Sequence, residues 1–294
     1  MEPSLKKKDL QISYTHLLLT RFNLNYSSQD GKPYRCDEKW HHHRFNIFIN
    51  YTLPSVQGQS SKKFKWIIFF NENLTSAYGE VIAEIVQKMP EIEFIYVKED
   101  QDHIEILHQN IKETVSSQYL LTTRLDNDDV ISKNLIKEVQ EIFFTELENK
   151  KENDFIINAG KGYQKEIIFP YRKSVIEDYR YSPFISLISN RSEIFGFRTV
   201  LDKPHHEWNN LLTTLEMDRI SWIQLIHEQN LANHVNTLNH VSKISNAEFP
   251  FLPEDSLLKS LSNSFFLPLQ IAFSAALVMW EKVKSRLKNL LLDT

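Results

Sequence analysis

Apolar and polar positions follow two different patterns along the first half of the chain. Short continuous apolar runs predict strands that are buried on both faces. Between them, apolar residues three or four positions apart predict helices, and Pro54 and Pro90 are expected to end the first two. In chain order the expected strands are 16–20, 64–70, 93–97 and 119–125, and the expected helices are 40–53, 75–88, 103–115 and 132–148.

This regular alternation of strands and helices predicts a parallel sheet with helices on both faces. Ligands of such sheets bind beyond the carboxyl ends of the strands. Polar residues follow three of the expected strands: Arg21 to Asn23, Asn71, and Asp126 to Asp129. We expect these side chains to meet at one edge of the sheet.

The pattern becomes less regular after Lys151. Two strands are expected to form a hairpin around Gly160 and Gly162, followed by a third strand, an irregular His-rich loop, and a helix with Trp222 facing inward. The expected ranges are 154–159 and 166–171 for the hairpin, 182–189 for the strand, 195–210 for the loop and 220–233 for the helix.

Composition narrows the class of protein. The 294 residues are 41% hydrophobic and 12% aromatic, which supports a core and excludes wholesale disorder. A net charge of −4 argues against a nucleic-acid binder. The single Cys36 excludes an intramolecular disulfide and a cysteine zinc site. The apolar run Leu17 to Leu19 is too short for a signal-peptide core, so we expect a cytoplasmic protein.

The acidic cluster Asp126, Asp128 and Asp129 is the main candidate for chemistry. Three carboxylates at a strand end repel one another, and Mg²⁺ or Mn²⁺ relieves that repulsion through oxygen ligands. A calcium loop of the EF-hand type fails, because Ile131 and Lys137 stand where it needs Gly and Glu. The remaining alternatives are a metal site for a nucleotide-diphosphate sugar and a solvated turn that caps the following helix.

Four ordered segments resemble the rhamnosyltransferase family of GT-A-fold glycosyltransferases. The sequence departs from that pattern at Asn127, where some members carry Asp, and after His227, where Glu228 replaces the usual glycine. The segments are Leu19-Thr-Arg-Phe-Asn23, the stretch from His43 to Ile67, Thr123-Arg-Leu-Asp-Asn-Asp-Asp129, and the stretch from Trp222 to Asn233.

The resemblance implies a role for each matching residue. Asp126 would contact the nucleoside, and Asp128 would bind the Mn²⁺ or Mg²⁺ that bridges the diphosphate, with Asp129 assisting. Arg124 would neutralise phosphate charge or orient the carboxylates. His227 would complete the metal site, with an ordinary histidine on a helix as the alternative.

The segment after the first strand would bind the rest of the nucleotide. The resemblance places Thr20, Arg21 and Asn23 around the base and ribose. Among the adjacent residues His41 to His43, neighbours on a helix point in different directions, so we expect no metal cluster there. His43 or Arg44 is instead expected near the nucleotide.

An inverting reaction needs a general base for the acceptor hydroxyl. Asp218 is the first candidate, with Glu216 and Glu207 as second choices and helix capping or surface exposure as the ordinary alternative for each. His205 and His206 are candidates for acceptor contact. Side chains that can stack on a sugar, or simply pack in the core, are Tyr163, Tyr171, Trp208 and Trp222.

The C-terminal sequence predicts a separate helical appendage. We expect a GT-A domain over 1–248 and a helical segment over 249–294. Its apolar run 265–280 is too short for a confident transmembrane span, and a basic amphipathic stretch follows. Residues 265–292 therefore suit an anionic membrane surface, with a helical hairpin packed on the domain or on a dimer partner as the alternative.

These features together predict a metal-dependent glycosyltransferase. It would move a hexose or deoxyhexose, such as rhamnose, from a nucleotide-diphosphate donor to a glycan or glycolipid acceptor, such as lipopolysaccharide or capsule. The alternatives are a metal-dependent nucleotidyl- or phosphotransferase that uses the same carboxylates, and a non-catalytic glycan-binding protein with a GT-A-like domain.

Overall fold

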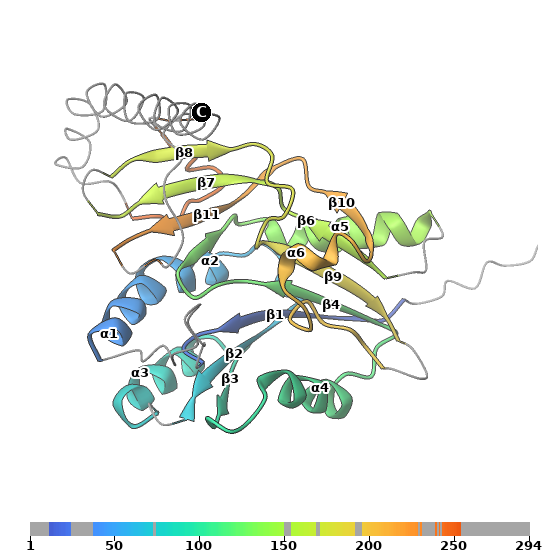
Figure 1. The fold of residues 1–294 in the computed structure, drawn as a ribbon, viewed down its shortest axis with the longest axis horizontal. Helices are drawn as coiled ribbons and strands as arrows, with labels where there is room; N and C mark the ends of the chain where they lie inside the picture. The colour runs from blue at the N-terminus through green and yellow to red at the C-terminus, as the bar shows by residue number, and fades with distance from the viewer. Residues whose placement is uncertain are drawn as a thin grey trace, which may run out of the picture.

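The computed structural model shows an α/β architecture built on two sheets (Figure 1). It describes residues 12–24, 38–72, 75–149, 154–168, 171–191, 196–228, 230, 239, 241 and 243–253. The expected C-terminal appendage lies outside the described residues from position 254 onward. In the part that is described, no helix is long and apolar enough to cross a membrane.

The larger sheet has seven strands and a parallel centre. Its strands are β1 (Tyr14–Arg21), β2 (Lys65–Asn71), β3 (Ile92–Val97), β4 (Tyr119–Arg124), β6 (Phe155–Asn158), β9 (Ile185–Asn190) and β10 (Thr213–Glu216). Their order is β10-β6-β9-β4-β1-β2-β3, with β1 to β4 mutually parallel and β9 antiparallel to both neighbours. The predicted parallel sheet is confirmed.

The smaller sheet carries the strands that the sequence predicted least well. It consists of β5 (Asp129–Ile131), β11 (Ile220–Ile226), β7 (Lys161–Glu166) and β8 (Lys173–Ile176), in that order. The hairpin predicted between 154–159 and 166–171 is wrong. β6 belongs to the larger sheet, and the chain then crosses over so that β7 pairs antiparallel with β8.

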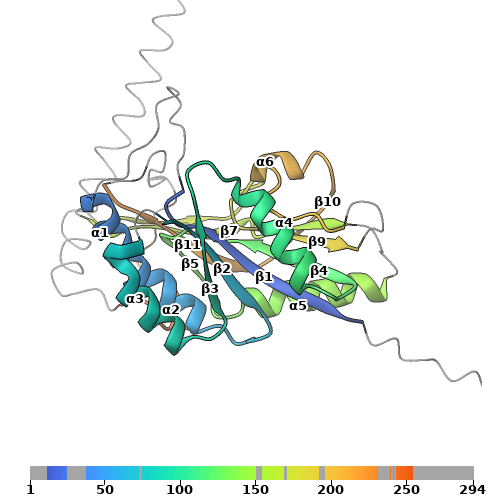
Figure 2. The same ribbon diagram turned by 90° about the horizontal axis from the view of Figure 1, so that it is seen from below.

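Helices cover both faces of the larger sheet, as predicted (Figure 2). They are α1 (Glu38–Ile47), α2 (Leu53–Gln57), α3 (Thr75–Lys88), α4 (His103–Thr114), α5 (Leu135–Glu148) and the short α6 (His205–Trp208). Apolar residues of α3 and α5 share one core with one face of the sheet, and those of α4 and α6 share the core on the opposite face.

Strand β2 shows why these runs are continuously apolar. Trp66 and Ile68 pack into the core beneath α3 and α5, whereas Ile67 and Phe69 pack into the core beneath α4. Alternate side chains of a strand point to opposite faces, so a strand covered on both sides needs an apolar residue at every position.

The helix predicted over 40–53 continues further than expected. After α1 a π-helical turn over Phe48–Thr52 leads directly into α2, so Pro54 does not end the helix. Pro54 stands in the first turn of α2, where proline is tolerated because its fixed φ of about −65° suits a helical turn. The segment ends at Gly58, whose N–H donates to the carbonyl of Pro54 at 2.8 Å.

The helix predicted over 220–233 is wrong. Residues 220–226 form strand β11, in which every side chain from Ser221 to Ile226 is buried. Trp222 packs into one core, whereas Ile223 and Leu225 pack into another. Burial on both faces produces a run of apolar residues that fits a buried helix equally well by periodicity.

Candidate functional site

Hydrogen bonds tie the carboxyl ends of β1, β2 and β4 together. Asn23 Oδ1 accepts from the backbone N–H of Asn71 at 2.8 Å, and Asn127 Nδ2 donates to the carbonyl of Phe22 at 2.7 Å. The N–H of Leu125 donates to Leu19 at 3.0 Å. The structure thus brings the predicted polar segments to one edge of the sheet.

Asn127, which interrupts the acidic run, holds the loop in place. Besides its bond to Phe22, its Oδ1 accepts from Arg44 Nη1 at 3.2 Å and its carbonyl accepts from Thr52 Oγ1 at 3.1 Å. The side chain is buried and uses both its donor and its acceptor. Aspartate lacks the donor, so this residue is not equivalent to one more acid.

Replacing Asn127 with aspartate is therefore expected to destabilise the protein. The buried carbonyl of Phe22 would lose its donor and face a carboxylate, at a cost of about 1–3 kcal/mol. Urea unfolding measures the change. Asn50→Asp is the matched control, because Asn50 also donates to a backbone carbonyl, at 2.7 Å, but from an exposed position. Equal losses in the two variants would contradict the role of Asn127.

Asp128 pairs with side chains from two distant parts of the chain. Its Oδ2 forms a buried ion pair with Arg44 of α1 and lies 3.1 Å from His227 Nε2 at the end of β11. Burial alone would raise the pKa of Asp128, but the His227 hydrogen bond and the Arg44 charge lower it below its ordinary value. Asp128 is therefore ionised at neutral pH.

His227 lies at a strand end and not on the predicted helix. Its Nδ1 is 3.2 Å from His43 Nε2, which extends the chain of contacts from Asp128 to α1. Burial and the His227 charge lower the pKa of His43, which favours its neutral form. If His227 donates from Nε2 to Asp128, its Nδ1 accepts from His43.

The Asp128–His227 pair has the chemistry and spacing for a divalent cation. Two ligands at right angles on one octahedral ion stand about 3 Å apart, which matches the observed separation. No group of three His, Cys, Asp or Glu side chains is arranged to hold a metal within the described residues. Oxygen atoms of a bound diphosphate would have to supply further ligands, as is usual for Mg²⁺.

The other two acids are directed elsewhere. Asp126 is held by both its oxygens against Arg124 Nη2, at 2.6 and 2.9 Å, and Arg124 also donates to the carbonyl of Pro183. Asp129 lies in β5 and accepts from the N–H of Leu225 at 3.3 Å. Burial raises the pKa of Asp129 well above its ordinary value, and the charges of Asp128 and Asp126 raise it further.

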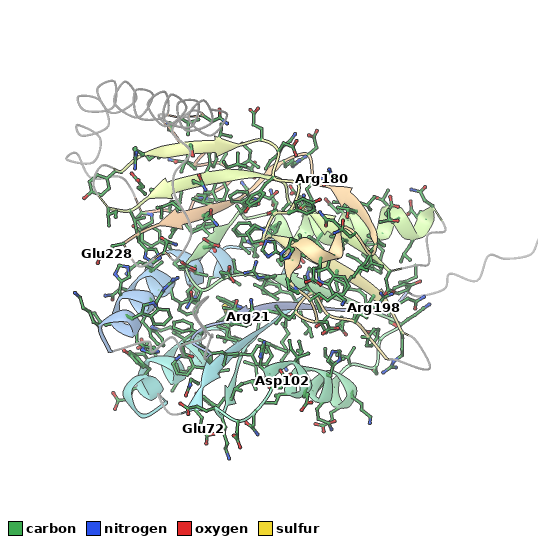
Figure 3. The ribbon with its side chains drawn as sticks, in the orientation of Figure 1. Arg21, Glu72, Asp102, Arg180, Arg198 and Glu228 are labelled. Carbon is green, nitrogen blue, oxygen red and sulfur yellow. The ribbon has the colours of Figure 1, made fainter. Side chains whose placement is uncertain are left out.

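A pocket opens at the ends of β2 and β3. Its lining includes Asn71, Glu99 and His103. Burial lowers the pKa of His103, and the charge of Arg21 lowers it further. Figure 3 labels Arg21 in the middle of the molecule. Thr20 is instead buried in the core, where its hydroxyl accepts from Trp66 Nε1 at 2.9 Å.

The predicted general bases lie apart from the aspartate loop. Asp218 is exposed over 94% of its side chain and pairs with Lys161, whose hydrogen bond and charge lower the pKa of Asp218. Glu216 accepts from Asn158 Nδ2 at 2.8 Å at the end of β10. Because β10 is three strands from β4, roughly 14 Å separates the two strands. Only an acceptor long enough to span this distance would contact both Glu216 and the aspartate loop.

His205 is electrostatically linked to the loop, a link that the sequence pattern did not specify. Burial and the charge of Arg124 lower the pKa of His205 and the charge of Asp126 raises it, so that the pKa lies at about 4. The imidazole is thus neutral at neutral pH and able to accept a hydrogen bond. Its partners lie about eighty positions earlier in the chain, where no local pattern reveals them.

Most of the candidate stacking residues serve the core. Trp222 stacks on Phe184 with ring centroids 4.5 Å apart, and Trp208 Nε1 donates to the carbonyl of Val200 at 3.1 Å.

His41, the first of three adjacent histidines, is buried with Nε2 3.2 Å from Asn23 Nδ2. The three histidines do point in different directions, because His42 is exposed.

The sequence matches a known family over most of the helices and strands described above. The model of the family described as "Putative rhamnosyl transferase" matches residues 15–238, from β1 to beyond the Asp128–His227 pair. The chain belongs to this family. The predicted recognition is confirmed, and so is the α/β fold with a mainly parallel central sheet that it implied.

Solved structures with some likeness to this chain include two that contain a nucleotide or a nucleotide sugar. TarS 1-349 of S. aureus in complex with UDP has 10% identity and a TM-score of 0.39 over 72% of this chain and 60% of that one. Mannosyltransferase PcManGT of Pyrobaculum calidifontis, in complex with GDP-Man and Mn²⁺, has 8% identity and a TM-score of 0.41 over 76% and 62%. The chain thus spans about 60% of the length of TarS 1-349. None of the curated proteins matches the sequence.

Proposed function

We propose that this protein transfers a hexose or deoxyhexose, such as rhamnose, from a nucleotide-diphosphate sugar to a cell-surface glycan. The observation that carries the proposal is the buried Asp128–His227 pair at the carboxyl edge of the parallel sheet, in a chain of the rhamnosyltransferase family. A carboxylate and an imidazole that converge at such an edge suit a diphosphate-bound cation.

The donor would extend from the pocket to the aspartate loop. The nucleoside end would occupy the space lined by Asn71, Glu99 and His103, where the charge of Arg21 is felt by His103. Asp128 and His227 would hold Mn²⁺ or Mg²⁺ against the diphosphate. When bound, the cation would stabilise the negative charge that develops on the departing nucleoside diphosphate.

The chain's own residues would position the sugar and the acceptor. Arg124 fixes the carboxylate of Asp126 beside the expected diphosphate site, so that Asp126 can accept a hydrogen bond from a hydroxyl group. The neutral His205, whose pKa reflects the charges of Arg124 and Asp126, would hydrogen-bond an acceptor hydroxyl. Asp218 and Glu216 would bind more distant parts of an extended acceptor. We also propose, from sequence alone, that residues 265–292 contact the membrane on the cytoplasmic side.

A donor screen tests this proposal. Nucleoside diphosphates and their sugars, each with Mn²⁺, Mg²⁺ or EDTA, are expected to raise the melting temperature selectively, because a ligand that binds only the folded state stabilises it. The stabilising donor is then incubated with the enzyme. Release of nucleoside diphosphate supports glycosyl transfer, whereas release of pyrophosphate in a parallel incubation with a nucleoside triphosphate and a sugar phosphate would identify a nucleotidyltransferase. No selective stabilisation and no donor turnover would contradict the proposal.

A further inference from the structure

The oxygen of Asp128 that lies beside His227 already contacts a positively charged side chain, that of Arg44. Arg44 Nη1 forms its ion pair with Oδ2, the same atom that lies 3.1 Å from His227 Nε2. Both partners of the ion pair are about nine-tenths buried, with side-chain exposures of 10% and 11%. The attraction between the guanidinium and the carboxylate is therefore weakly screened by water.

A divalent cation on Asp128 and His227 would compete with this guanidinium. The cation would need the lone pair of Oδ2 and the unprotonated Nε2 of His227. With Arg44 in its present position, two positive groups would then contact one carboxylate oxygen inside a buried site. Their repulsion in such surroundings is strong, so the cation can bind tightly only if Arg44 moves away.

Arg44 is also incompletely satisfied where it stands. Its Nε is buried and has no hydrogen-bond partner among the described residues, and its bond from Nη1 to Asn127 measures 3.2 Å, at the upper end of the ordinary range. A buried donor without an acceptor is costly, so an arrangement that offers new acceptor oxygens would be favoured. The ring of Trp40, whose centroid lies 5.1 Å from the guanidinium carbon, offers the charge a second favourable contact besides Asp128.

We propose that Arg44 is an internal counter-ion that keeps divalent cations off Asp128 until a nucleoside diphosphate binds. The diphosphate would offer acceptor oxygens to the guanidinium and, at the same time, the missing ligands to the cation. The proposal rests on the proposed function of this site and adds an order of events to it. Nucleotide and cation would bind cooperatively, and the cation alone would bind weakly.

Titration with Mn²⁺, followed by electron paramagnetic resonance without any nucleotide, tests the competition directly. Arg44→Gln is expected to bind Mn²⁺ about tenfold more tightly than the wild-type protein, the order of coupling usual between linked sites. Arg44→Lys keeps the charge and is expected to stay close to wild type. Arg219→Gln is the matched control, because Arg219 pairs with Glu138 at an exposed position, with 71% of its side chain accessible.

A second comparison tests whether the tighter Mn²⁺ binding of Arg44→Gln depends on Asp128. In Arg44→Gln combined with Asp128→Asn the tighter binding should disappear, because the carboxylate that receives the cation is gone. Equal or weaker Mn²⁺ binding in Arg44→Gln, or no binding in either protein, would overturn the proposal. The wild-type protein alone also tests it, since saturation by equimolar Mn²⁺ without nucleotide would overturn it even if no variant folded. Donor turnover by wild type is measured separately, so failure here is distinguishable from failure of the proposed function.

Discussion

Asp128→Asn is expected to lower the transfer rate by about 10²–10³-fold, the usual effect of removing one electrostatic contact from a transition state. The substitution keeps the size of the side chain but removes the charge that receives both Arg44 and the expected cation. It should also abolish the part of nucleotide-sugar binding that depends on Mn²⁺ or Mg²⁺. Initial rates and calorimetric titration, each with a divalent cation and with EDTA, measure the two effects.

The control for this substitution is Glu141→Gln, which makes the same change of group on α5. Glu141 is 61% exposed and pairs only with Lys137 one turn away, so its loss should leave transfer unchanged. Undiminished cation-dependent binding in Asp128→Asn would remove Asp128 from the metal site. A loss of binding that is equally large in EDTA would instead show that Asp128 acts through Arg44 and the loop.

The fold around this site was predictable where the local sequence of an element alone indicates its secondary structure. Strand β2 is continuously apolar from Trp66 to Phe70 because both of its faces are buried, and such a run is recognisable in isolation. The parallel order followed from the regular alternation with helices. The position of Asp126 to Asp129 at the sheet edge followed in turn, because parallel strands run in the same direction and their carboxyl ends therefore lie at one edge of the sheet.

The site itself depends on contacts that no local pattern contains. Arg44 and Asp128 are 84 positions apart, and His227 reaches Asp128 across 99 positions only because β11 is a strand beside β5. A helix over 220–233 would have given His227 a different neighbourhood. The sequence predicted that His43 or Arg44 lies near the nucleotide, but it did not show that Arg44 is the direct partner of Asp128.

Trp222→Ala is expected to lower the free energy of unfolding by about 3–5 kcal/mol, the usual cost of deleting a large buried aromatic side chain. The indole is fully buried, stacks on Phe184 at an interplanar angle of 9°, and donates from Nε1 to the carbonyl of Ala159 at 2.6 Å. Its removal would leave a cavity between the two sheets. Urea unfolding measures the loss, and Leu211→Ala, at a position that is 56% exposed, is the control, with an expected change within about 0.5 kcal/mol.

A double-mutant cycle with Gly162 makes this prediction specific to strand β11. A Cβ added at Gly162 would come within 2.1 Å of Trp222 Cδ2, so Gly162→Ala should be strongly destabilising alone. In the Trp222→Ala background the added methyl group enters the vacated space, and most of its cost should vanish, since residues in contact do not act additively. Additive losses from the two substitutions would contradict the packing of β11 against β7. They would also reopen the question of how His227 reaches Asp128.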